Sequence, residues 1–223
     1  MGSEADAATR RAWLAQCSRI AAAGLAAAAM PWRSAHAATP VVLVLGDSLS
    51  AEYGLARGSG WVALLAQRIA KAGLRWRVVN ASISGDTTSG GLSRLPALLQ
   101  EHRPAVVVIE LGANDALRGL PLAMTRSNLE AMAKAAKAAG AKVVIVGMQL
   151  PPNYGRQYGD EFAALFGRVA KAEHAALVPF LLHGVADVPG ADANFQSDRI
   201  HPLASQHPRM LDNVWPVLRP LLR

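Results

Sequence analysis

Five short apolar runs, rich in β-branched residues, recur along the chain from residue 41 onward. The first, Val41–Leu45, has no polar residue and ends at Gly46, a pattern typical of a strand buried on both faces. The other runs follow at intervals long enough to hold a helix between each pair: Arg77–Asn80, Ala105–Leu111, Val143–Val146 and Leu177–Phe180. The pattern predicts five strands that alternate with helices.

The segments between these runs have helical periodicity. In two of them the apolar residues share one helical face: Trp61, Leu64, Leu65 and Ile69 in the first, and Leu129, Met132, Ala136 and Ala139 in the second. Gly140 is placed to end the second helix. A final apolar segment, Met210–Leu222, is also predicted to be helical although it contains Pro216 and Pro220.

This alternation defines the fold class. Neighbouring parallel strands are joined by right-handed crossovers, and each crossover usually contains a helix. We therefore expect an α/β fold: a three-layer α/β/α sandwich around a flavodoxin-like parallel sheet of about five strands. Residues 38–223 contain no repeat, linker-like tract or low-complexity segment, so we expect one domain. In such folds ligands bind beyond the carboxyl ends of the strands, which makes the polar residues there the candidates for chemistry.

Residues 1–37 have the features of an export signal. An Ala-rich apolar run follows basic residues and precedes Ala35-His36-Ala37, a sequence of the A-x-A cleavage type. The run is too short to span a bilayer. The pair Arg10-Arg11 ahead of it fits a twin-arginine signal, and an ordinary secretory signal is the alternative. We expect a periplasmic or secreted protein whose mature chain lacks cysteine, because the one cysteine is Cys17.

Composition limits the partners. The chain has 223 residues, 52% hydrophobic and 17% charged, which suits one domain with a continuous core. The formal net charge is +7, but the basic residues are dispersed and are not interleaved with aromatic residues. We expect no nucleic-acid partner, at most transient contact with a membrane surface, and a monomer. One cysteine excludes an intrachain disulfide and a Cys-based zinc site.

The polar residues beyond the strands match the needs of acyl transfer. Ser48 follows the first predicted strand, and Asp198 and His201 lie together near the C-terminus. A serine hydroxyl becomes a strong nucleophile when a histidine takes its proton, and a carboxylate fixes the tautomer of that histidine. We predict that Ser48 is the nucleophile, His201 the base and Asp198 the group that orients it.

Attack on an acyl carbonyl creates an oxyanion, which needs positioned hydrogen-bond donors. The backbone N–H groups of Ser48 and Gly85 and the side-chain amide of Asn114 are suitable, and the loss of one such donor costs about 3 kcal/mol. Gly85 has no Cβ to obstruct the substrate. We expect Asp47 to anchor its loop and Asp115 to cap a helix.

The remaining histidines have no evident partner in the sequence. We interpret them as surface or packing residues: His102, His174, His183 and His207. The chain also lacks a G-x-S-x-G elbow, a P-loop, a G-x-G-x-x-G loop and an H-E-x-x-H helix. We expect neither a cofactor nor a metal.

Four sequence blocks resemble those of the GDSL or SGNH hydrolases: Gly46–Ser50, Asn80–Thr87, Gly112–Asp115 and Asp198–Pro202. Within that family the chain is similar to the bacterial acyl-CoA thioesterase I, lysophospholipase L1 and arylesterase group. The closer similarity rests on three further segments: Gly91–Leu99, Leu117–Gly119 and Leu150–Gly155.

The resemblance covers essentially all of residues 38–223. It implies a serine esterase that hydrolyses acyl esters and thioesters through an acyl-enzyme, with Tyr154 beside the acyl site as a substrate-binding residue. The chain departs from the family pattern in the small residues Thr88–Gly91, and in Ala113, where glycine is common.

Two other functions fit part of this pattern. A carbohydrate O-acetylesterase on the same fold would use the same three residues, because the triad is indifferent to the alcohol side of the ester. A non-catalytic lipid- or glycan-binding protein would keep the fold but would have no need of a nucleophile with its base.

Overall fold

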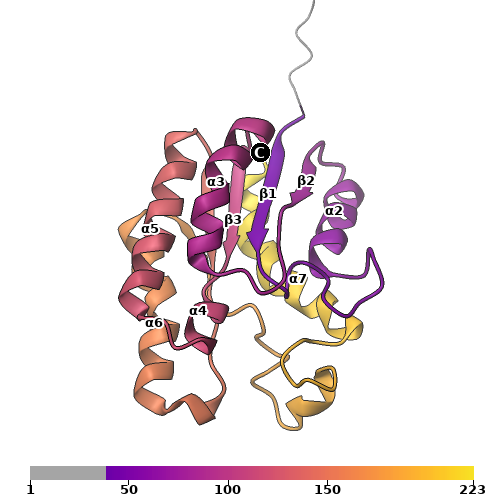
Figure 1. The fold of residues 1–223 in the computed structure, drawn as a ribbon. Coiled ribbons are helices and arrows are strands. Elements are labelled where there is room, and N and C mark those ends of the chain that lie inside the picture. The colour runs from indigo at the N-terminus through magenta and orange to yellow at the C-terminus, as the bar shows by residue number, and fades with distance from the viewer. Residues whose placement is uncertain (1–38) are drawn as a thin grey trace, which may run out of the picture. The chain divides into compact units, whose positions relative to one another are not determined.

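The five apolar runs form one parallel sheet in the computed structural model, which describes residues 39–223 (Figure 1). The predicted export signal, residues 1–37, lies outside the described residues. The sheet order is β2-β1-β3-β4-β5, the flavodoxin-like order that we expected. The strands are β1 (Val41–Gly46), β2 (Arg77–Asn80), β3 (Val106–Glu110), β4 (Lys142–Val146) and β5 (Ala176–Val178).

The central strands are buried because helices cover both of their faces. Every residue of β1 and β3 is buried, whereas β2, at one edge, is half-buried to exposed. Gly46 pairs with Glu110 in the register of β1 and β3, so these two strands end side by side. The residues that follow Gly46 and Glu110 therefore start from neighbouring points on one edge of the sheet.

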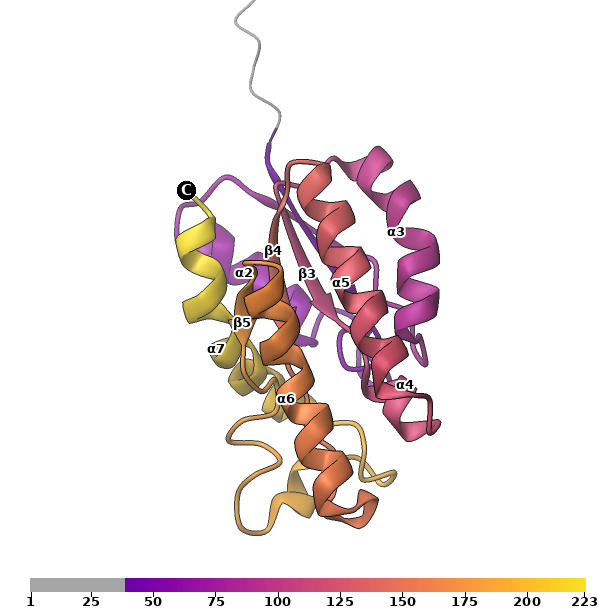
Figure 2. The ribbon, with the colours of Figure 1, turned by 90° about the vertical axis from the view of Figure 1, so that its left-hand side faces the viewer.

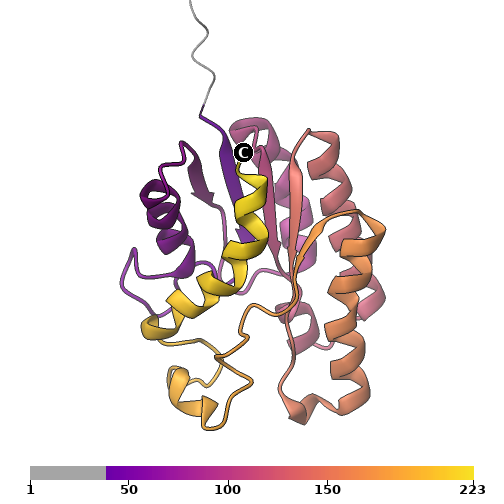
Figure 3. The ribbon, with the colours of Figure 1, turned by 180° about the vertical axis from the view of Figure 1, so that it is seen from behind.

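Five long helices form the outer layers of the sandwich (Figures 2 and 3). One face carries α2 (Trp61–Lys71) and α7 (His207–Leu218), which pack against each other. The other face carries α3 (Thr88–His102), α5 (Leu122–Ala138) and α6 (Arg156–Ala172), with α5 between the other two. The predicted three-layer sandwich is confirmed.

Prolines account for differences at two predicted elements. Strand β5 ends at Val178 instead of Phe180, because Pro179 has no N–H to continue the ladder. The C-terminal segment is helical as predicted, with Pro216 inside α7, but α7 starts at His207 instead of Met210 and ends at Leu218 instead of Leu222. A 3₁₀ turn that contains Pro220, η5 (Arg219–Leu221), follows it. The remaining elements are short: α4 (Ala113–Leu117), η2 (Pro152–Tyr154), η3 (Ala191–Asn194) and η4 (Ala204–Gln206).

The carboxyl ends of all five strands lie at one edge of the sheet, the lower edge in Figure 1. The loops that follow the strands gather there, together with the long connection from β5 to α7. Within residues 39–223 no helix has the length and apolar composition needed to cross a membrane.

Candidate active site

Ser48 lies in a tight turn directly after β1. The carbonyl of Asp47 accepts hydrogen bonds from the N–H groups of Ser50 (3.2 Å) and Ala51 (2.9 Å), which turns the chain at the end of the strand. The Oγ of Ser48 is 2.8 Å from the Nε2 of His201, although 153 residues separate the two along the chain. The fold therefore brings the predicted nucleophile and the predicted base into hydrogen-bond contact.

The Asp198–His201 loop is held by its own carboxylate. The Oδ1 of Asp198 accepts the backbone N–H groups of Ile200 (2.9 Å) and His201 (3.0 Å), while Oδ2 is 2.7 Å from the Nδ1 of His201. Arg199 has a φ of 57°, so the loop doubles back within one residue. The backbone N–H of His201 is the main cause of a lowered Asp198 pKa, about 2, and the carboxyl group stays ionised across the physiological range.

Two backbone N–H groups on residues of the cavity lining are available for an oxyanion. Neither the Ser48 N–H nor the Gly85 N–H donates a hydrogen bond to any other residue between 39 and 223. Gly85 has a φ of 77°, which a residue with a Cβ rarely adopts, and its carbonyl accepts a hydrogen bond from Arg118 Nη2 (2.8 Å). Both predicted backbone donors lie on residues that line one cavity with His201.

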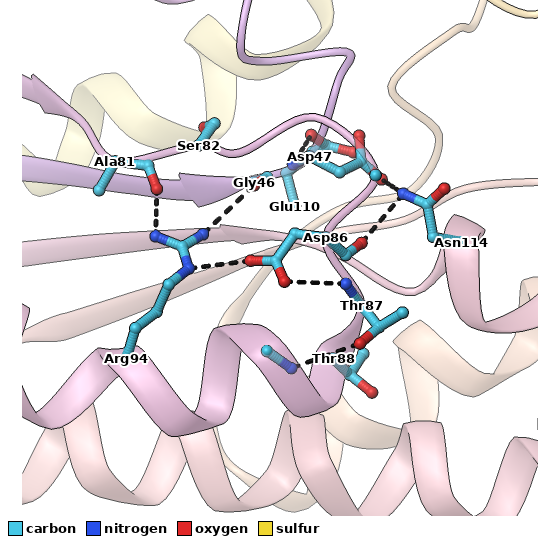
Figure 4. A network of polar contacts seen from close by, with 12 residues as sticks. Gly46, Asp47, Ala81, Ser82, Asp86, Thr87, Thr88, Arg94, Glu110 and Asn114 are labelled. Atoms are coloured by element: carbon cyan, nitrogen blue, oxygen red, sulfur yellow. Dashed lines mark hydrogen bonds and ion pairs between the residues drawn. The ribbon is translucent and has the colours of Figure 1, made fainter.

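The side-chain amide of Asn114 is already engaged. Its Nδ2 donates to Asp47 Oδ2 (3.0 Å) and to the carbonyl of Asp86 (3.0 Å), as Figure 4 shows. Asn114 lines the same cavity as Ser48 and Gly85. An amide nitrogen has two hydrogens, so Asn114 can stabilise an oxyanion only by sharing or exchanging one of these bonds.

Arg94, on α3, joins the loops that carry these groups (Figure 4). Its Nε donates to Asp86 Oδ2 (2.8 Å), Nη2 donates to the carbonyl of Gly46 (3.4 Å), and Nη1 donates to the carbonyl of Ala81. Asp86 in turn accepts the N–H of Thr87 (3.0 Å). One guanidinium therefore contacts the end of β1, the residue after β2 and the residue whose carbonyl holds the Asn114 amide.

Two buried carboxyl groups support the turn at Ser48. Asp47 Oδ1 accepts the N–H of Leu49 (3.1 Å), and Glu110 Oε2 accepts the hydroxyl of Ser50 (2.7 Å) and the N–H of Asp47 (3.4 Å). Burial raises the pKa of Asp47 to about 7 and the pKa of Glu110 well above its usual range. Asp47 anchors the loop, as we expected from the sequence, whereas sequence reasoning gave Glu110 no role.

These residues surround a cavity of about 790 Å³, and its walls are mainly apolar. The apolar lining comes from α4 and from the loops after several strands: Leu49, Tyr53, Leu117, Met148, Leu150, Pro151, Phe180, Leu182 and Phe195. Tyr154, the predicted substrate-binding residue, is not part of this lining. It lies at the end of η2, where its N–H bonds to the carbonyl of Pro151, and its side chain is exposed.

Sequence reasoning missed Tyr53, the aromatic residue nearest the predicted base. Its ring lies 4.3 Å from the ring of His201, centroid to centroid, at 35°. The Nε2 of Gln196 donates to the carbonyls of Tyr53 (3.0 Å) and Pro202 (3.3 Å), so one side chain joins the two loops. The sequence gives one indication that Tyr53 lies near the site: it follows Ser48 by five residues in the same loop.

Two sequence interpretations need correction, and a third, for His207, is confirmed with a specific contact. His183 has a partner, since its Nδ1 is 2.7 Å from Asp187 Oδ2. Asp115 does not cap its own helix: it is buried and accepts hydrogen bonds from the backbone N–H (2.8 Å) and hydroxyl of Thr88, at the start of α3. His207 is a packing residue with a specific role, because its Nδ1 accepts the N–H of Trp61 (3.0 Å). These contacts are long-range or depend on side-chain direction, so no local pattern shows them.

No cluster of three or more potential metal ligands occurs in residues 39–223. The arrangement at Ser48 instead has the parts of a nucleophilic acyl-transfer site: a hydroxyl in contact with an imidazole, a carboxylate on the far nitrogen of that imidazole, and free backbone N–H groups nearby. The apolar cavity beside them has room for a hydrocarbon chain.

The chain is similar to known esterases in sequence and in structure. Residues 44–207 match the GDSL-like lipase/acylhydrolase family. The chain is 56% identical over 187 residues to esterase TesA of Pseudomonas aeruginosa, and this match covers 84% of this chain and 92% of the relative. It is 41% identical over 186 residues to thioesterase 1/protease 1/lysophospholipase L1 of Escherichia coli, and that match covers 83% of this chain and 86% of the relative. A solved structure of the psychrotrophic esterase EstA from a Pseudoalteromonas species, inhibited by monoethylphosphonate, has a TM-score of 0.76 at 38% identity and covers 82% of this chain and 98% of that chain.

Proposed function

Because this chain belongs to the GDSL-like lipase/acylhydrolase family and is a serine esterase, we propose that Ser48, His201 and Asp198 carry out the hydrolysis. The observation that carries the proposal is the continuous set of contacts from Ser48 Oγ to His201 Nε2 (2.8 Å) and from His201 Nδ1 to Asp198 Oδ2 (2.7 Å). This is the order of contacts that a serine nucleophile requires.

The reaction proceeds through an acyl-enzyme. Ser48 Oγ attacks the acyl carbonyl carbon while His201 Nε2 takes the hydroxyl proton, and the carbonyl oxygen becomes an oxyanion. The N–H groups of Ser48 and Gly85 stabilise this oxyanion, together with Asn114 when its amide gives up or shares one acceptor. The tetrahedral intermediate collapses as His201 returns the proton to the leaving alcohol or thiol. Water then attacks the acyl-enzyme with His201 again as base, which releases the acid and restores Ser48.

The cavity favours substrates with a hydrocarbon acyl chain. Its walls include Met148, Leu150, Phe180 and Leu182, and burial of methylene groups against such walls is favourable. A sugar acetate would leave most of this apolar surface unused. We therefore place acyl esters and thioesters of aryl alcohols, lysophospholipids or similar leaving groups ahead of carbohydrate acetates.

We further propose that residues 1–37 are removed on export and that residues 38–223 act as a monomer in the periplasm or outside the cell. The support is the signal-like pattern of the first 37 residues. Residues 39–223 contain a continuous hydrophobic core and form a compact unit of their own.

The test is the initial rate of hydrolysis of p-nitrophenyl esters from acetate to palmitate by residues 38–223. We expect Ser48→Ala to lose at least about 10⁴-fold in kcat on every ester, because no other hydroxyl of residues 39–223 forms a hydrogen bond with the His201 ring. The rate of the unmodified enzyme should hold or rise with chain length. Inactivation by a phosphonate ester should attach phosphorus to Ser48 and should be absent in the variant.

The matched control is Ser127→Ala, which removes an exposed hydroxyl on α5 and should leave every rate unchanged. Substantial hydrolysis by folded Ser48→Ala would show that another group is the nucleophile. A Ser48-dependent rate confined to acetate would move the assignment to a deacetylase.

A further inference from the structure

The exposed large apolar side chains of the described chain all lie on loops at the active-site edge of the sheet. Six residues of this kind are at least about one-third exposed, and we call them the apolar rim: Tyr53, Ile83, Tyr154, Val188, Ile200 and Leu203. The loops that follow β1, β2 and β4 carry one each, and the connection from β5 to α7 carries three. The lower edge of the molecule in Figures 1 and 3 is formed by these loops.

The apolar rim continues into the catalytic cavity. Tyr53 and Ile200 are themselves part of the cavity lining. Ile83, 53% exposed, directly precedes Ser84 and Gly85, and Val188 directly follows Asp187, all of which line the cavity. Single exposed apolar residues are common, but a set that lies on the loops lining one apolar cavity indicates a surface that contacts something apolar.

The cations at this edge of the sheet favour an anionic partner. Arg199 lies on the connection from β5 to α7, Arg118 directly follows α4, and Arg156 is the first residue of α6. All three are exposed, and within residues 39–223 none of them forms an ion pair. Two nearby carboxylates are engaged by neighbouring imidazoles, since Asp187 contacts His183 and Asp198 contacts His201 at 2.7 Å each. The exposed carboxylate of Asp192, on the cavity wall, opposes this trend. Free cations around an apolar patch suit a surface of anionic amphiphiles.

We propose that the apolar rim docks on the surface of aggregated anionic lipid, a micelle or a bilayer, and that the acyl chain of the ester passes from this aggregate directly into the cavity. The inference rests on the proposed function, because the docked lipid is the source of the substrate. Partial insertion of the isoleucine, valine and tyrosine side chains supplies the apolar contact, and the three arginines contact the headgroups.

The first test is binding to vesicles, measured by flotation of residues 38–223 carrying Ser48→Ala so that no lipid is hydrolysed. We expect binding to phosphatidylcholine vesicles that contain phosphatidylglycerol, weaker binding to phosphatidylcholine alone, and weakening by salt. The double substitution Ile83→Ser/Val188→Ser should lower the partition coefficient by about tenfold, because it removes two apolar side chains that lie outside the cavity lining. The matched control, Ile83→Leu/Val188→Ile, should bind like the parent protein.

The second test compares two substrates with Ser48 intact. The Ile83→Ser/Val188→Ser enzyme should hydrolyse monomeric p-nitrophenyl butyrate at the unmodified rate, and thermal unfolding should show that it is folded. It should lose about tenfold in rate on palmitoyl lysophosphatidylglycerol above the concentration at which this lipid forms micelles. A loss of rate on the micelles without a loss of rate on the monomeric ester would show that the substitutions affect docking and not the chemical reaction.

Equal vesicle binding by the double serine variant and its parent would overturn the proposal. So would concentration-dependent dimerisation that the serine substitutions abolish, because the apolar rim would then be an interface between two copies of the chain. Absence of Ser48-dependent hydrolysis of monomeric esters would instead refute the proposed function, and the vesicle assay in the Ser48→Ala background would still report on docking.

Discussion

At the scale of single residues, Arg94 is the side chain whose loss should affect several parts of the site at once. It contacts Asp86 and the carbonyls of Gly46 and Ala81, and the carbonyl of Asp86 holds the amide of Asn114. We expect Arg94→Met to lower kcat by about 10- to 100-fold with little change in KM, because misplaced oxyanion donors weaken transition-state binding more than substrate binding. Steady-state kinetics on p-nitrophenyl butyrate measure both constants.

Two further variants make the Arg94 prediction specific. Arg94→Lys should recover only part of the loss, since one ammonium group cannot replace three directional donors. Arg126→Met removes an exposed arginine that pairs with Glu130 on α5 and should leave kcat unchanged. If kcat of Arg94→Met equals that of Arg126→Met, Arg94 has no part in positioning the oxyanion donors.

At the scale of elements, His207 joins α7 to α2. Gly60, at the N-terminus of α2, has no side chain to cap the helix, and His207 Nδ1 accepts the first helical N–H, that of Trp61. We expect His207→Leu to lower the free energy of unfolding by about 1–3 kcal/mol, because a buried N–H loses its acceptor. Urea unfolding at neutral pH measures this change.

The same contact should make stability depend on pH. Burial lowers the pKa of His207 below its ordinary value of 6.5, so below that pH the unfolded chain binds the proton more readily than the folded chain. The free energy of unfolding contributed by His207 therefore decreases as the pH falls below about 6.5. Between pH 7 and pH 5 the free energy of unfolding should fall less in His207→Leu than in the unmodified protein. In His174→Leu, which replaces an exposed histidine, it should fall as much as in the unmodified protein. An identical decrease in all three proteins would contradict this role.

At the scale of the whole molecule, the compact unit of residues 39–223 should be independent of the export signal. Residues 39–223 have a continuous hydrophobic core of their own, so we expect removal of residues 1–37 to leave the thermal unfolding midpoint of the protein unchanged. In a Gram-negative bacterial host we expect the full chain to be cleaved after Ala37 and recovered in the periplasm. N-terminal sequencing of the fractionated protein measures both, and an uncleaved cytoplasmic chain would refute the assignment.

Substitution of both arginines in the pair Arg10-Arg11 by lysine separates the two export routes. A twin-arginine signal should lose export, whereas an ordinary secretory signal keeps its basic charge and should continue to function.

Much of the fold follows from local patterns in the sequence. A strand buried on both faces is mostly apolar, so β1, β3 and β4 stand out as apolar runs, although Glu110 ends β3 and Lys142 begins β4. Parallel strands place all of their carboxyl ends on one edge. For this reason the motifs containing Ser48, Gly85 and Asn114 could be assigned to one site before any contact was known.

The linear order of residues was therefore enough for the class of fold, the parallel sheet and the residue types at the active edge. The contacts at that edge depended on packing between segments far apart in the chain. Only the folded structure places Tyr53 and not Tyr154 on the cavity wall, engages the Asn114 amide with Asp47 and Asp86, and brings His207 to Trp61. The physical reason is that periodicity in the sequence shows which face of an element is buried. The contact partner of a side chain depends on how the elements are arranged in three dimensions, and the spacing of residues in the sequence does not contain that information.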